Sequence, residues 1–284
     1  MDITLIRYGE LALKSQPVRS RFENTLSSNI RAGLKLVDID YKVKKYFGRL
    51  FIEGHDKKIE PVLKRVFGIV SFSHCKKIIT DIEEIKKVSL QLAKNIKKVS
   101  SFAVRCNRIG KHNFGSQDVE RTVGAEIVEK FGLRVNLTKP DKTIGVEIRD
   151  KDAYIFSDVV SCFGGLPIGT AGKVACVIND FNGAMAAWLF MKRGCRIVAF
   201  IKSKSSEKYL RILQNWYIGY DLKSYYLKNT SIERLVEETK SEALITGETL
   251  ENFKQTKLDI PVFRPLVGFD KKYLAKMKRV IETN

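Results

Sequence analysis

The stretch from Gly172 to Phe200 reads GKVACVINDFNGAMAAWLFMKRGCRIVAF. Val174 to Ile178 is an apolar run of strand length, and Asn179 to Gly183 is a cluster of turn-forming residues. Ala184 to Met191 favours helix and is apolar on all sides, which predicts a buried helix. Arg196 to Phe200 begins the next strand. The order predicts a βαβ unit whose loop lies where parallel-sheet proteins bind nucleotide phosphate.

The loop of this unit has an unusual composition for a phosphate site. It reads Ile178-Asn179-Asp180-Phe181-Asn182-Gly183, with one glycine at its end and a carboxylate in its middle. A phosphate cradle needs small residues, so that backbone N–H groups can approach the anion. Asp180 would repel a pyrophosphate unless a metal lay between them. We therefore expect the architecture of a nucleotide site without its chemistry.

Composition and charge suggest a class of partner. The chain has 284 residues, enough for two or three domains, and its 44% hydrophobic and 29% charged content is typical of a globular protein. The net charge of +19 indicates a polyanionic partner, with nucleic acid as the first candidate.

The sequence gives little support for a membrane span, a signal peptide, a metal site or a nucleophilic triad. No apolar run reaches membrane-spanning length and the opening MDITLIRYGE lacks a signal peptide, so we expect a cytoplasmic protein. The five cysteines form no CxxC pair and the three histidines are scattered. We therefore expect buried thiols, no metal site and no nucleophilic triad.

The pattern of apolar residues predicts two units before the βαβ unit. The first has the order βαββαβ of a ferredoxin-like domain; its elements span 3–8, 17–34, 41–46, 50–53, 58–66 and 69–72. The second comprises helices over 81–96 and from an N-cap at Ser116, and strands over 102–105, 133–137, 143–148 and 153–157. A Gly/Pro-rich linker, 162–172, follows, and helices are expected at 207–216, 231–240 and 271–281, with a strand at 242–245.

A basic segment in the second unit suggests an RNA contact. Arg105, Arg108 and Lys111 leave the end of a predicted strand, in a loop running from Cys106 to Gly115 into a helix N-terminus. Helix N-termini and arginine forks bind phosphates. The aromatic ring of Phe114 has two readings, since it could stack on an unpaired base or pin the loop to the core.

Four motifs together resemble the tRNA 4-thiouridine synthetase (ThiI) family. They are Arg7-Tyr8-Gly9-Glu10 with Leu11-Ala12-Leu13-Lys14, GGLPIGTAGK at 164–173, Thr246-Gly247-Glu248, and PVFRPLVGFDK at 261–271. The resemblance implies an N-terminal ferredoxin-like domain at 1–55, a THUMP RNA-binding domain at 56–163, and a Rossmann-type α/β PP-loop domain (adenine nucleotide alpha-hydrolase-like) at 164–284. In that family the first two domains bind tRNA and its 3′ end. The third uses ATP to adenylate a uridine, and a cysteine persulfide supplies sulfur.

The chain departs from the family pattern at the nucleotide loop. Anchored on Lys192-Arg193-Gly194, the family loop SGGxDS falls on Ile178 to Gly183, so its serines, glycines and aspartate are replaced. After Thr246-Gly247-Glu248 a family stretch containing SLGQ has no counterpart, because Thr249-Leu250-Glu251-Asn252 follows directly. By resemblance the nucleotide would be lined by Cys176, Val177, Ile201, Lys202 and Gly247.

From these observations we expect a tRNA-binding protein with a decayed adenylation loop, a pseudoenzyme or a protein that depends on a partner for chemistry. The predicted RNA-binding residues are Lys14, Arg105, Arg108, Lys111, Arg121 and Lys139. One alternative is an active ATP-dependent tRNA sulfurtransferase that makes 4-thiouridine and also serves thiamine biosynthesis, with ATP and Mg²⁺ as its cofactors. Another is a non-RNA interaction module. The resemblance also implies a homodimer and a sulfur-donor or catalytic partner protein.

Overall fold

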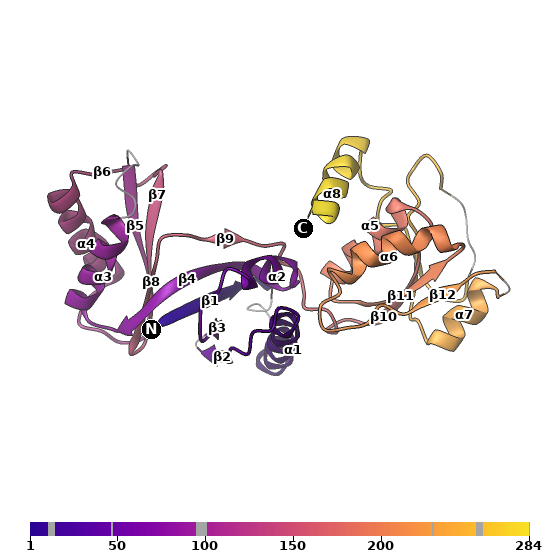
Figure 1. The fold of residues 1–284 in the computed structure, drawn as a ribbon, viewed down its shortest axis with the longest axis horizontal. Coiled ribbons are helices and arrows are strands. Elements are labelled where there is room, and N and C mark those ends of the chain that lie inside the picture. Colours follow the sequence, from indigo (N-terminus) through magenta and orange to yellow (C-terminus); the bar gives the residue numbers. More distant parts are fainter. Residues whose placement is uncertain (11–14, 47, 95–100, 229, 254–257, 284) are drawn as a thin grey trace. The chain divides into compact units, whose positions relative to one another are not determined.

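A computed structural model describes residues 1–284 except 11–14, 47, 95–100, 229, 254–257 and 284 (Figure 1). The chain divides into two compact units. The first contains Met1–Arg7, Tyr41–Lys57 and Ser71–Ser161, and the second contains Tyr8–Asp40, Lys58–Val70 and Cys162–Asn284. Among the described residues, no helix has the length and apolar character needed to span a membrane.

The first sheet begins with the strands of the predicted ferredoxin-like segment. These are β1 (Asp2–Tyr8), β2 (Val43–Tyr46), β3 (Arg49–Ile52) and β4 (Ile69–Ile79). They lie in the order β2-β3-β1-β4, and β3 pairs antiparallel with both β1 and β2. The chain order β1-α1-β2-β3-α2-β4 is that of a ferredoxin-like fold, as predicted.

The two helices of that segment, α1 (Gln16–Lys35) and α2 (Ile59–Arg65), belong to the second unit. A proline in the first turn starts α1, where the missing N–H has no intrahelical partner to lose. The helices meet closely at Gly33, because a Cβ there would lie 2.6 Å from Cγ1 of Val62. Larger residues at this position would push the two helices apart.

The rest of the first sheet is covered on one face by two helices. Its strands are β5 (Ser101–Ile109), β6 (Arg134–Val135), β7 (Lys142–Arg149), β8 (Asp152–Phe156) and β9 (Val160–Ser161). The order continues β4-β8-β7-β5-β6, and β9 pairs with β4. The covering helices, α3 (Ile82–Lys94) and α4 (Ser116–Phe131), bury their apolar stripes against alternate residues of β5, β7 and β8.

Two predictions for this region were wrong. The loop expected from Cys106 is a strand as far as Ile109, because β5 pairs in parallel with β7 from Phe102↔Lys142 to Ile109↔Arg149. Tertiary pairing therefore extends a strand through a polar sequence. The helix cap is Gly115 rather than Ser116, and the Asp118 carboxylate accepts the Gly115 N–H at 2.8 Å.

The second sheet is entirely parallel and confirms the predicted Rossmann-type class. Its strands are β10 (Lys173–Val177), β11 (Arg196–Ile201), β12 (Ser224–Tyr226), β13 (Leu244–Ile245) and β14 (Val262–Phe263), in the order β12-β11-β10-β13-β14. After β10 the chain continues to β11 on one side, and later to β13 on the other. The carboxyl ends of β10 and β13 thus flank a topological switch point, where open α/β sheets bind ligands.

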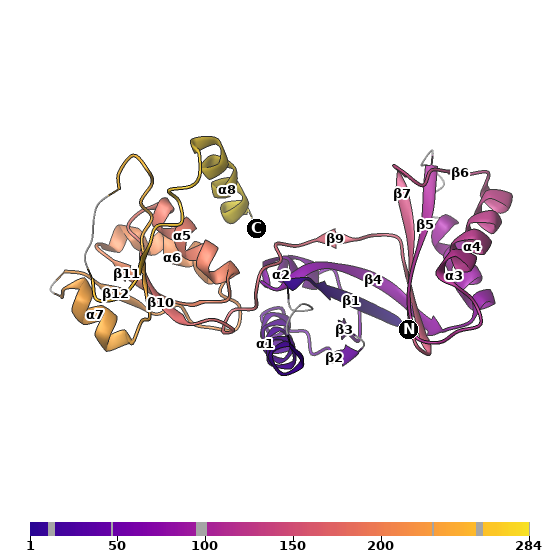
Figure 2. The ribbon, with the colours of Figure 1, turned by 180° about the vertical axis from the view of Figure 1, so that it is seen from behind.

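Helices cover both faces of the second sheet (Figure 2). On one face lie α5 (Phe181–Lys192), α6 (Glu207–Gln214) and α8 (Lys271–Thr283), and on the other α7 (Ile232–Thr239). A short 3-10 helix, η2 (Lys204–Ser206), precedes α6. Alternate residues of β10 point to opposite faces of the sheet and pack in the core on each face. Cys176 packs beneath α5, whereas Ala175 packs towards α7.

An aromatic cluster lies at the centre of the second unit. It consists of Phe67, Phe163, Trp188 and Trp216, and both tryptophans are buried. The ring centroids of Trp188 and Trp216 are 5.3 Å apart in an edge-to-face arrangement, and Phe67 stacks on Trp216 at 5.7 Å. The indole N–H of Trp216 donates to the Ile281 carbonyl at 3.1 Å, so the cluster also fixes the end of α8. This cluster joins residues from distant parts of the sequence into one core.

Candidate functional site

The loop between β10 and α5 begins with a core residue. Ile178 is fully buried, and its backbone N–H donates to the Phe200 carbonyl at 2.8 Å. The residue therefore continues the pairing of β10 with β11 for one position. Its side chain packs in the core beneath α5. At the place where the family loop begins with serine, this chain has a structural residue.

The polar residues of the loop bond to the chain itself. Asp180 is the N-cap of α5, and its Oδ1 accepts the Gly183 N–H at 2.9 Å. Oδ1 of Asn179 accepts the Lys202 N–H at 3.0 Å, and the Asn179 carbonyl accepts from the Ser206 hydroxyl at 3.3 Å. An N–H group that could bind an anion at the start of α5 is thus occupied by a carboxylate of the loop.

Two glycines allow the loop to pack against the neighbouring strand end. A Cβ at Gly183 would lie 2.5 Å from the Val177 carbonyl oxygen and 2.9 Å from Cα of Ile178. A Cβ at Gly247, just after β13, would lie 2.3 Å from the Gly183 nitrogen. All of these neighbours are backbone atoms, which cannot rotate away. The glycines are therefore required by close packing of backbone on backbone.

Replacing Gly183 with alanine is expected to lower the free energy of unfolding by about 1–3 kcal/mol, because the new methyl group overlaps backbone. The measurement is the urea midpoint of the full chain. A matched control is Gly124→Ala on α4, where a Cβ would meet nothing within 4 Å. That control should be neutral or stabilising by up to about 1 kcal/mol, since it removes a helical glycine. Equal midpoints for the two variants would contradict the packing argument.

A pocket of about 380 Å³ opens at the carboxyl ends of β10, β11 and β13. It is lined by Val177, Asn179, Asp180, Lys202, Leu227, Ile232, Leu244, Thr246, Gly247, Glu248 and Asn252. Of the five positions predicted to line a nucleotide, Val177, Lys202 and Gly247 are among these. The structure places Cys176 and Ile201 beneath the pocket, fully buried in the core. Asn182 instead lines a neighbouring pocket of about 750 Å³ with 249–252 and 267–271.

The pocket carries charges of both signs. Two carboxylates, Asp180 and Glu248, line it together with one lysine, Lys202. Arg264 forms an ion pair with Glu248 at 2.5 Å, so its guanidinium is already engaged. In the described part of the chain the hydroxyl of Thr246 is buried without a hydrogen-bond partner. The pocket could orient a polar group there, and the Asp180 carboxylate lies on its lining at the start of α5.

Two of the thiols of the second unit, Cys176 and Cys195, lie in its core. Burial raises the pKa of Cys176 well above its ordinary value, and burial also raises the pKa of Cys195 to about 11. Both side chains are therefore neutral thiols at physiological pH. Within the described residues, no group of three or more His, Cys, Asp or Glu side chains could hold a metal ion.

The predicted RNA-binding residues of β5 do not lie together. Arg105 and Arg108 are three positions apart on one strand, so their side chains leave opposite faces. The Arg105 guanidinium donates to the Leu137 carbonyl, beside β6. The Arg108 guanidinium donates to the Gly110 carbonyl at 3.0 Å and approaches Nδ1 of His112 at 3.1 Å. Arg108 therefore braces its own loop, whereas Arg105 faces solvent.

Of the remaining predicted contacts whose positions are described, only Arg121 lines a groove. Lys111, Arg121 and Lys139 are exposed, and Arg121 pairs with Asp118 at 3.4 Å. The groove between α4 and strands β5 and β6, about 580 Å³, is lined by Phe102, Val104, Gln117, Glu120, Arg121, Gly124, Ala125, Val128, Glu129, Val135 and Leu137. We call it the α4 groove. Lys14 lies outside the described residues. The Phe114 ring packs against the core and lies 5.6 Å from the His112 ring, which favours the pinning role.

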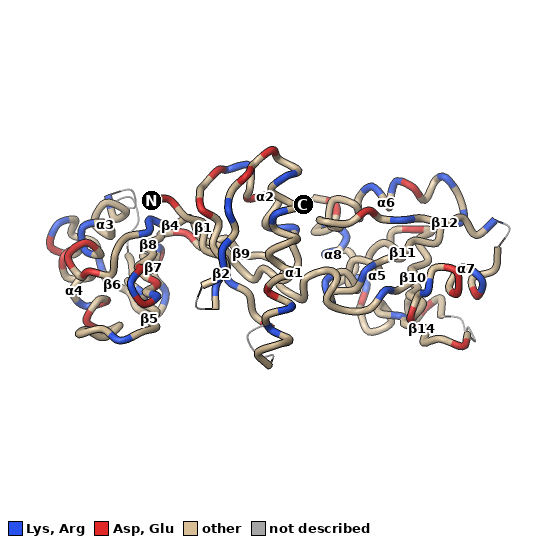
Figure 3. The backbone as a smooth tube through the Cα atoms, turned by 90° about the horizontal axis from the view of Figure 1, so that it is seen from below, with Lys and Arg blue, Asp and Glu red and all other residues tan. Residues whose placement is uncertain are grey.

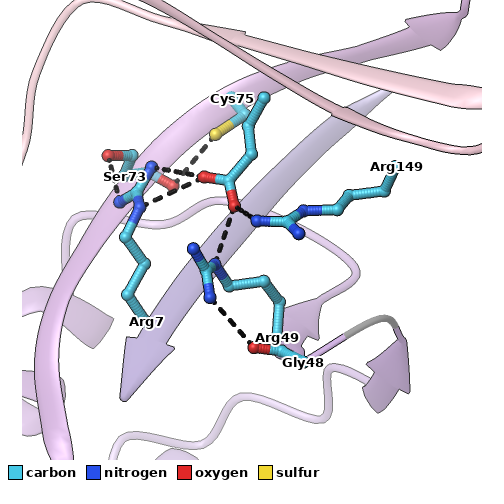
Figure 4. A network of polar contacts seen from close by, with 7 residues as sticks. Arg7, Gly48, Arg49, Ser73, Cys75 and Arg149 are labelled. Atoms are coloured by element: carbon cyan, nitrogen blue, oxygen red, sulfur yellow. Dashed lines mark hydrogen bonds and ion pairs between the residues drawn. The ribbon is translucent and has the colours of Figure 1, made fainter. Parts of the chain in front are cut away.

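Sequence reasoning missed a cluster of arginines around one carboxylate (Figure 4). Nε of Arg7 lies 3.2 Å from Oε2 of Glu147, and Nε of Arg49 lies 2.7 Å from Oε1. Arg149 forms a further ion pair with Oε1, and the Arg7 guanidinium also donates to the Ser73 hydroxyl at 3.0 Å. We call Arg7, Arg49, Arg149 and Glu147 the arginine cluster. The sequence signal for this cluster was the pair Glu147 and Arg149, two charged residues that alternate with apolar ones in the second half of β7.

The electrostatics of this cluster follow from burial and charge. The side chains of Glu147 and Arg149 are 4% and 2% exposed. Burial alone would raise the pKa of Glu147, but Arg49, Arg149 and Arg7 together hold that pKa below its ordinary value. Burial lowers the pKa of Arg49, and its neighbours Arg149 and Arg7 act in the same direction. The carboxylate is therefore ionised and central to the cluster.

Comparison with family models places two domains on the chain. The ThiI ferredoxin-like domain matches residues 3–73, and the THUMP domain matches residues 80–158. A probable tRNA sulfurtransferase of Methanocaldococcus jannaschii is 33% identical, with 98% of this chain and 87% of that protein covered. One of Saccharolobus islandicus is 34% identical over 97% of this chain and 85% of that protein. The first alignment runs over 335 positions, more than the 284 residues here, so the relative has segments without a counterpart.

Solved structures agree over the whole chain. PH1313 of Pyrococcus horikoshii has a TM-score of 0.87 at 27% identity, covering 99% of both chains. A 4-thiouridine synthetase, solved as an RNA complex with bound ATP, has a TM-score of 0.83 at 28% identity, covering 100% of this chain and 85% of that one. With two family domains in order and relatives that match along nearly its full length, this chain belongs to the tRNA sulfurtransferase (ThiI) family.

Proposed function

We propose that this chain is a tRNA-binding member of the family whose PP-loop domain does not adenylate its substrate, and that it contributes to tRNA modification together with a partner that performs the chemistry. The observation that carries the proposal is the cap of α5. Asp180 fills the helix start with its own carboxylate, at 2.9 Å from the Gly183 nitrogen. A second carboxylate, Glu248, lines the same pocket and is paired with Arg264. The Asp180 carboxylate and the occupied N–H group at the start of α5 disfavour a polyphosphate there.

The RNA-binding half of the proposal is supported by charge and by the α4 groove. Lys and Arg recur along both units rather than in one of them (Figure 3), and the net charge is +19. The α4 groove offers apolar walls with Arg121 on its lining. Apolar walls with cations nearby suit unstacked bases and their phosphates. The similar 4-thiouridine synthetase was solved with RNA.

The tRNA affinity of the full chain is expected to fall steeply with salt, because phosphate contacts release counterions. Arg105→Gln and Arg121→Gln should each reduce the slope of log K against log salt by about 0.9. The measurement is fluorescence anisotropy with labelled tRNA over a salt series. Arg234→Gln is the control. Arg234 lies on α7 of the second unit, is 73% exposed and pairs with Glu238, whereas Arg105 and Arg121 lie in the first unit. A tRNA affinity that is undetectable or insensitive to salt would instead support the non-RNA module.

The catalytic half is tested by ATP–pyrophosphate exchange in the presence of tRNA. We expect no exchange above the rate without protein. The second candidate function, an active tRNA sulfurtransferase, is favoured by one observation: the relatives named as probable sulfurtransferases match 97–98% of this chain. Exchange that is present in the wild type and abolished by Asn182→Ala would establish that alternative. Asn182 is suited to the test because it begins α5 beside the loop without lying in the buried core.

A further inference from the structure

We propose that the arginine cluster is an anion site that takes one phosphate group of bound RNA, an inference that rests on the RNA binding proposed above. The cluster joins the two domains matched by the family models. Arg7 and Arg49 come from the ferredoxin-like domain, and Glu147 and Arg149 come from the THUMP domain. All four belong to one compact unit, so the site lies within a single unit of the chain.

The first argument is charge. Three guanidinium groups face one carboxylate, and no other carboxylate pairs with these arginines among the residues that the structure describes. The cluster therefore carries two unbalanced positive charges. Arg149 is 2% exposed, and the side chains of Arg7 and Arg49 are only 17% and 21% exposed. Positive charge so far removed from water is costly unless an anion balances it.

The second argument is hydrogen bonding. Arg149 is buried, and its Nε donates to no partner within the described residues. Nη2 of Arg7 is likewise buried without a hydrogen bond, although it lies 3.2 Å from Oε2 of Glu147 as an ion pair. Buried donors of this kind are rare and usually have a bound partner. In Figure 4 the guanidinium groups of Arg7, Arg49 and Arg149 converge on one carboxylate, and their ion pairs identify it as that of Glu147.

The third argument is position. On the sheet, Asn107 of β5 pairs with Glu147 of β7, and Arg105 pairs with Gly145. Because alternate residues share a face, Arg105, Asn107, Glu147 and Arg149 lie on the face opposite α3 and α4. Arg105 is exposed on this face. An RNA strand held at Arg105 would thus pass the arginine cluster on the neighbouring strand.

The chemistry favours a phosphate over other ligands. Arginine forks bind phosphate through paired N–H donors, and the net positive charge excludes a metal ion. The Phe156 ring, 4.7 Å below the Arg7 guanidinium, holds that group flat against the sheet. An acidic peptide would offer a carboxylate of similar shape. We favour RNA because Arg105, on the same face, lies beside the cluster.

The test compares the salt dependence of tRNA binding in wild type, Arg49→Gln and Arg49→Lys. Arg49 is suited because it is the most exposed of the three arginines. Arg49→Gln should reduce the slope of log K against log salt by about 0.9, and Arg49→Lys should restore it, since lysine keeps the charge. Arg234→Gln is again the control and should leave the slope unchanged. A thermal midpoint for Arg49→Lys close to wild type separates this effect from unfolding.

A second arm locates the anion directly. Crystals of the full chain are soaked in selenate, a phosphate analogue with an anomalous signal, and a peak is expected beside Arg49 and Arg149. No peak, or a wild-type salt slope in Arg49→Gln, would overturn the inference. A selenate peak together with an unchanged salt slope in Arg49→Gln would mean that the site binds free anions rather than RNA. Displacement of selenate by polyglutamate but not by tRNA would mean that the site binds an acidic protein partner. Either result contradicts the assignment to an RNA phosphate. If wild type binds no tRNA at all, the proposed function itself fails, a result distinct from an unchanged slope.

Discussion

Replacing Glu147 with glutamine is expected to lower the free energy of unfolding by about 3–5 kcal/mol, the cost of removing one partner from a buried ion pair. The carboxylate contacts three guanidinium groups, of which Arg149 is 2% exposed. Glutamine keeps the shape and one carbonyl oxygen but removes the only charge that offsets those arginines within the cluster. The loss should therefore exceed that of any exposed acidic residue in the same unit.

The measurement is urea unfolding of the full chain, followed by circular dichroism. Glu84→Gln is the matched control: it removes an acidic residue on α3 that pairs with Lys87 at 3.3 Å and is 49% exposed. Exposed pairs contribute about 0–1 kcal/mol, so this variant should stay within that range. A Glu147→Gln midpoint close to that of the control would refute the structural importance of the cluster.

The same carboxylate makes stability depend on pH. Its folded-state pKa lies below the ordinary value of 4.5. The charged form therefore adds stability that is complete above the unfolded-state pKa and is lost as pH falls through the folded-state pKa. Wild type should lose this contribution below about pH 4.5, whereas Glu147→Gln lacks it at every pH. The free-energy difference between the two proteins should accordingly narrow on acidification.

Replacing Trp216 with alanine is expected to cost about 3–5 kcal/mol of stability, the usual range for removing a large aromatic residue from a core. The ring is fully buried and contacts Phe67, Phe163 and Trp188 with centroids 5.0–5.7 Å apart. The substitution leaves a cavity where α8 meets the aromatic cluster, and it removes the hydrogen bond to Ile281. The second unit should lose more stability than the first.

The matched control is Trp216→Phe, which keeps an aromatic ring but loses volume and the indole N–H. Its expected cost is about 1–2 kcal/mol, the loss of a buried hydrogen bond with a small change in packing. Emission from the remaining tryptophan, Trp188, reports on the second unit, because the chain has two tryptophans. A loss below about 1 kcal/mol for Trp216→Ala would mean that the cavity collapses without strain.

Most of the fold could be predicted from the sequence, because the spacing of apolar residues indicates which side of a helix or strand is buried. The apolar stripe Leu26, Ile30 and Leu34 gave α1, and the run Val174–Ile178 gave β10. The elements that escaped prediction depend on distant partners. β14 has two residues and β12 has three, and each is a strand only because it pairs with a neighbour far along the chain. β5 likewise continues through a polar sequence because β7 lies beside it.

The location of the candidate site could be predicted from the sequence, but the residues that line it could be predicted only in part. The position of the loop followed from the βαβ pattern, and Val177, Lys202 and Gly247 do line the pocket. The burial of Cys176 and Ile201 was harder to predict, because a buried parallel strand carries apolar residues on both of its faces. The arginine cluster draws on three strands, β1, β3 and β7, and such convergence leaves no local pattern.

The packing of Gly183 constrains how the family loop could be built into this chain. The family loop SGGxDS, aligned as above, ends in serine at this position. Any side chain here would place its first carbon 2.5 Å from the Val177 carbonyl oxygen. A single Gly183→Ser substitution toward the family pattern would therefore weaken the protein, unless the backbone at Val177 and Ile178 moved as well. Building the family loop into this chain thus calls for several coordinated substitutions rather than one at position 183.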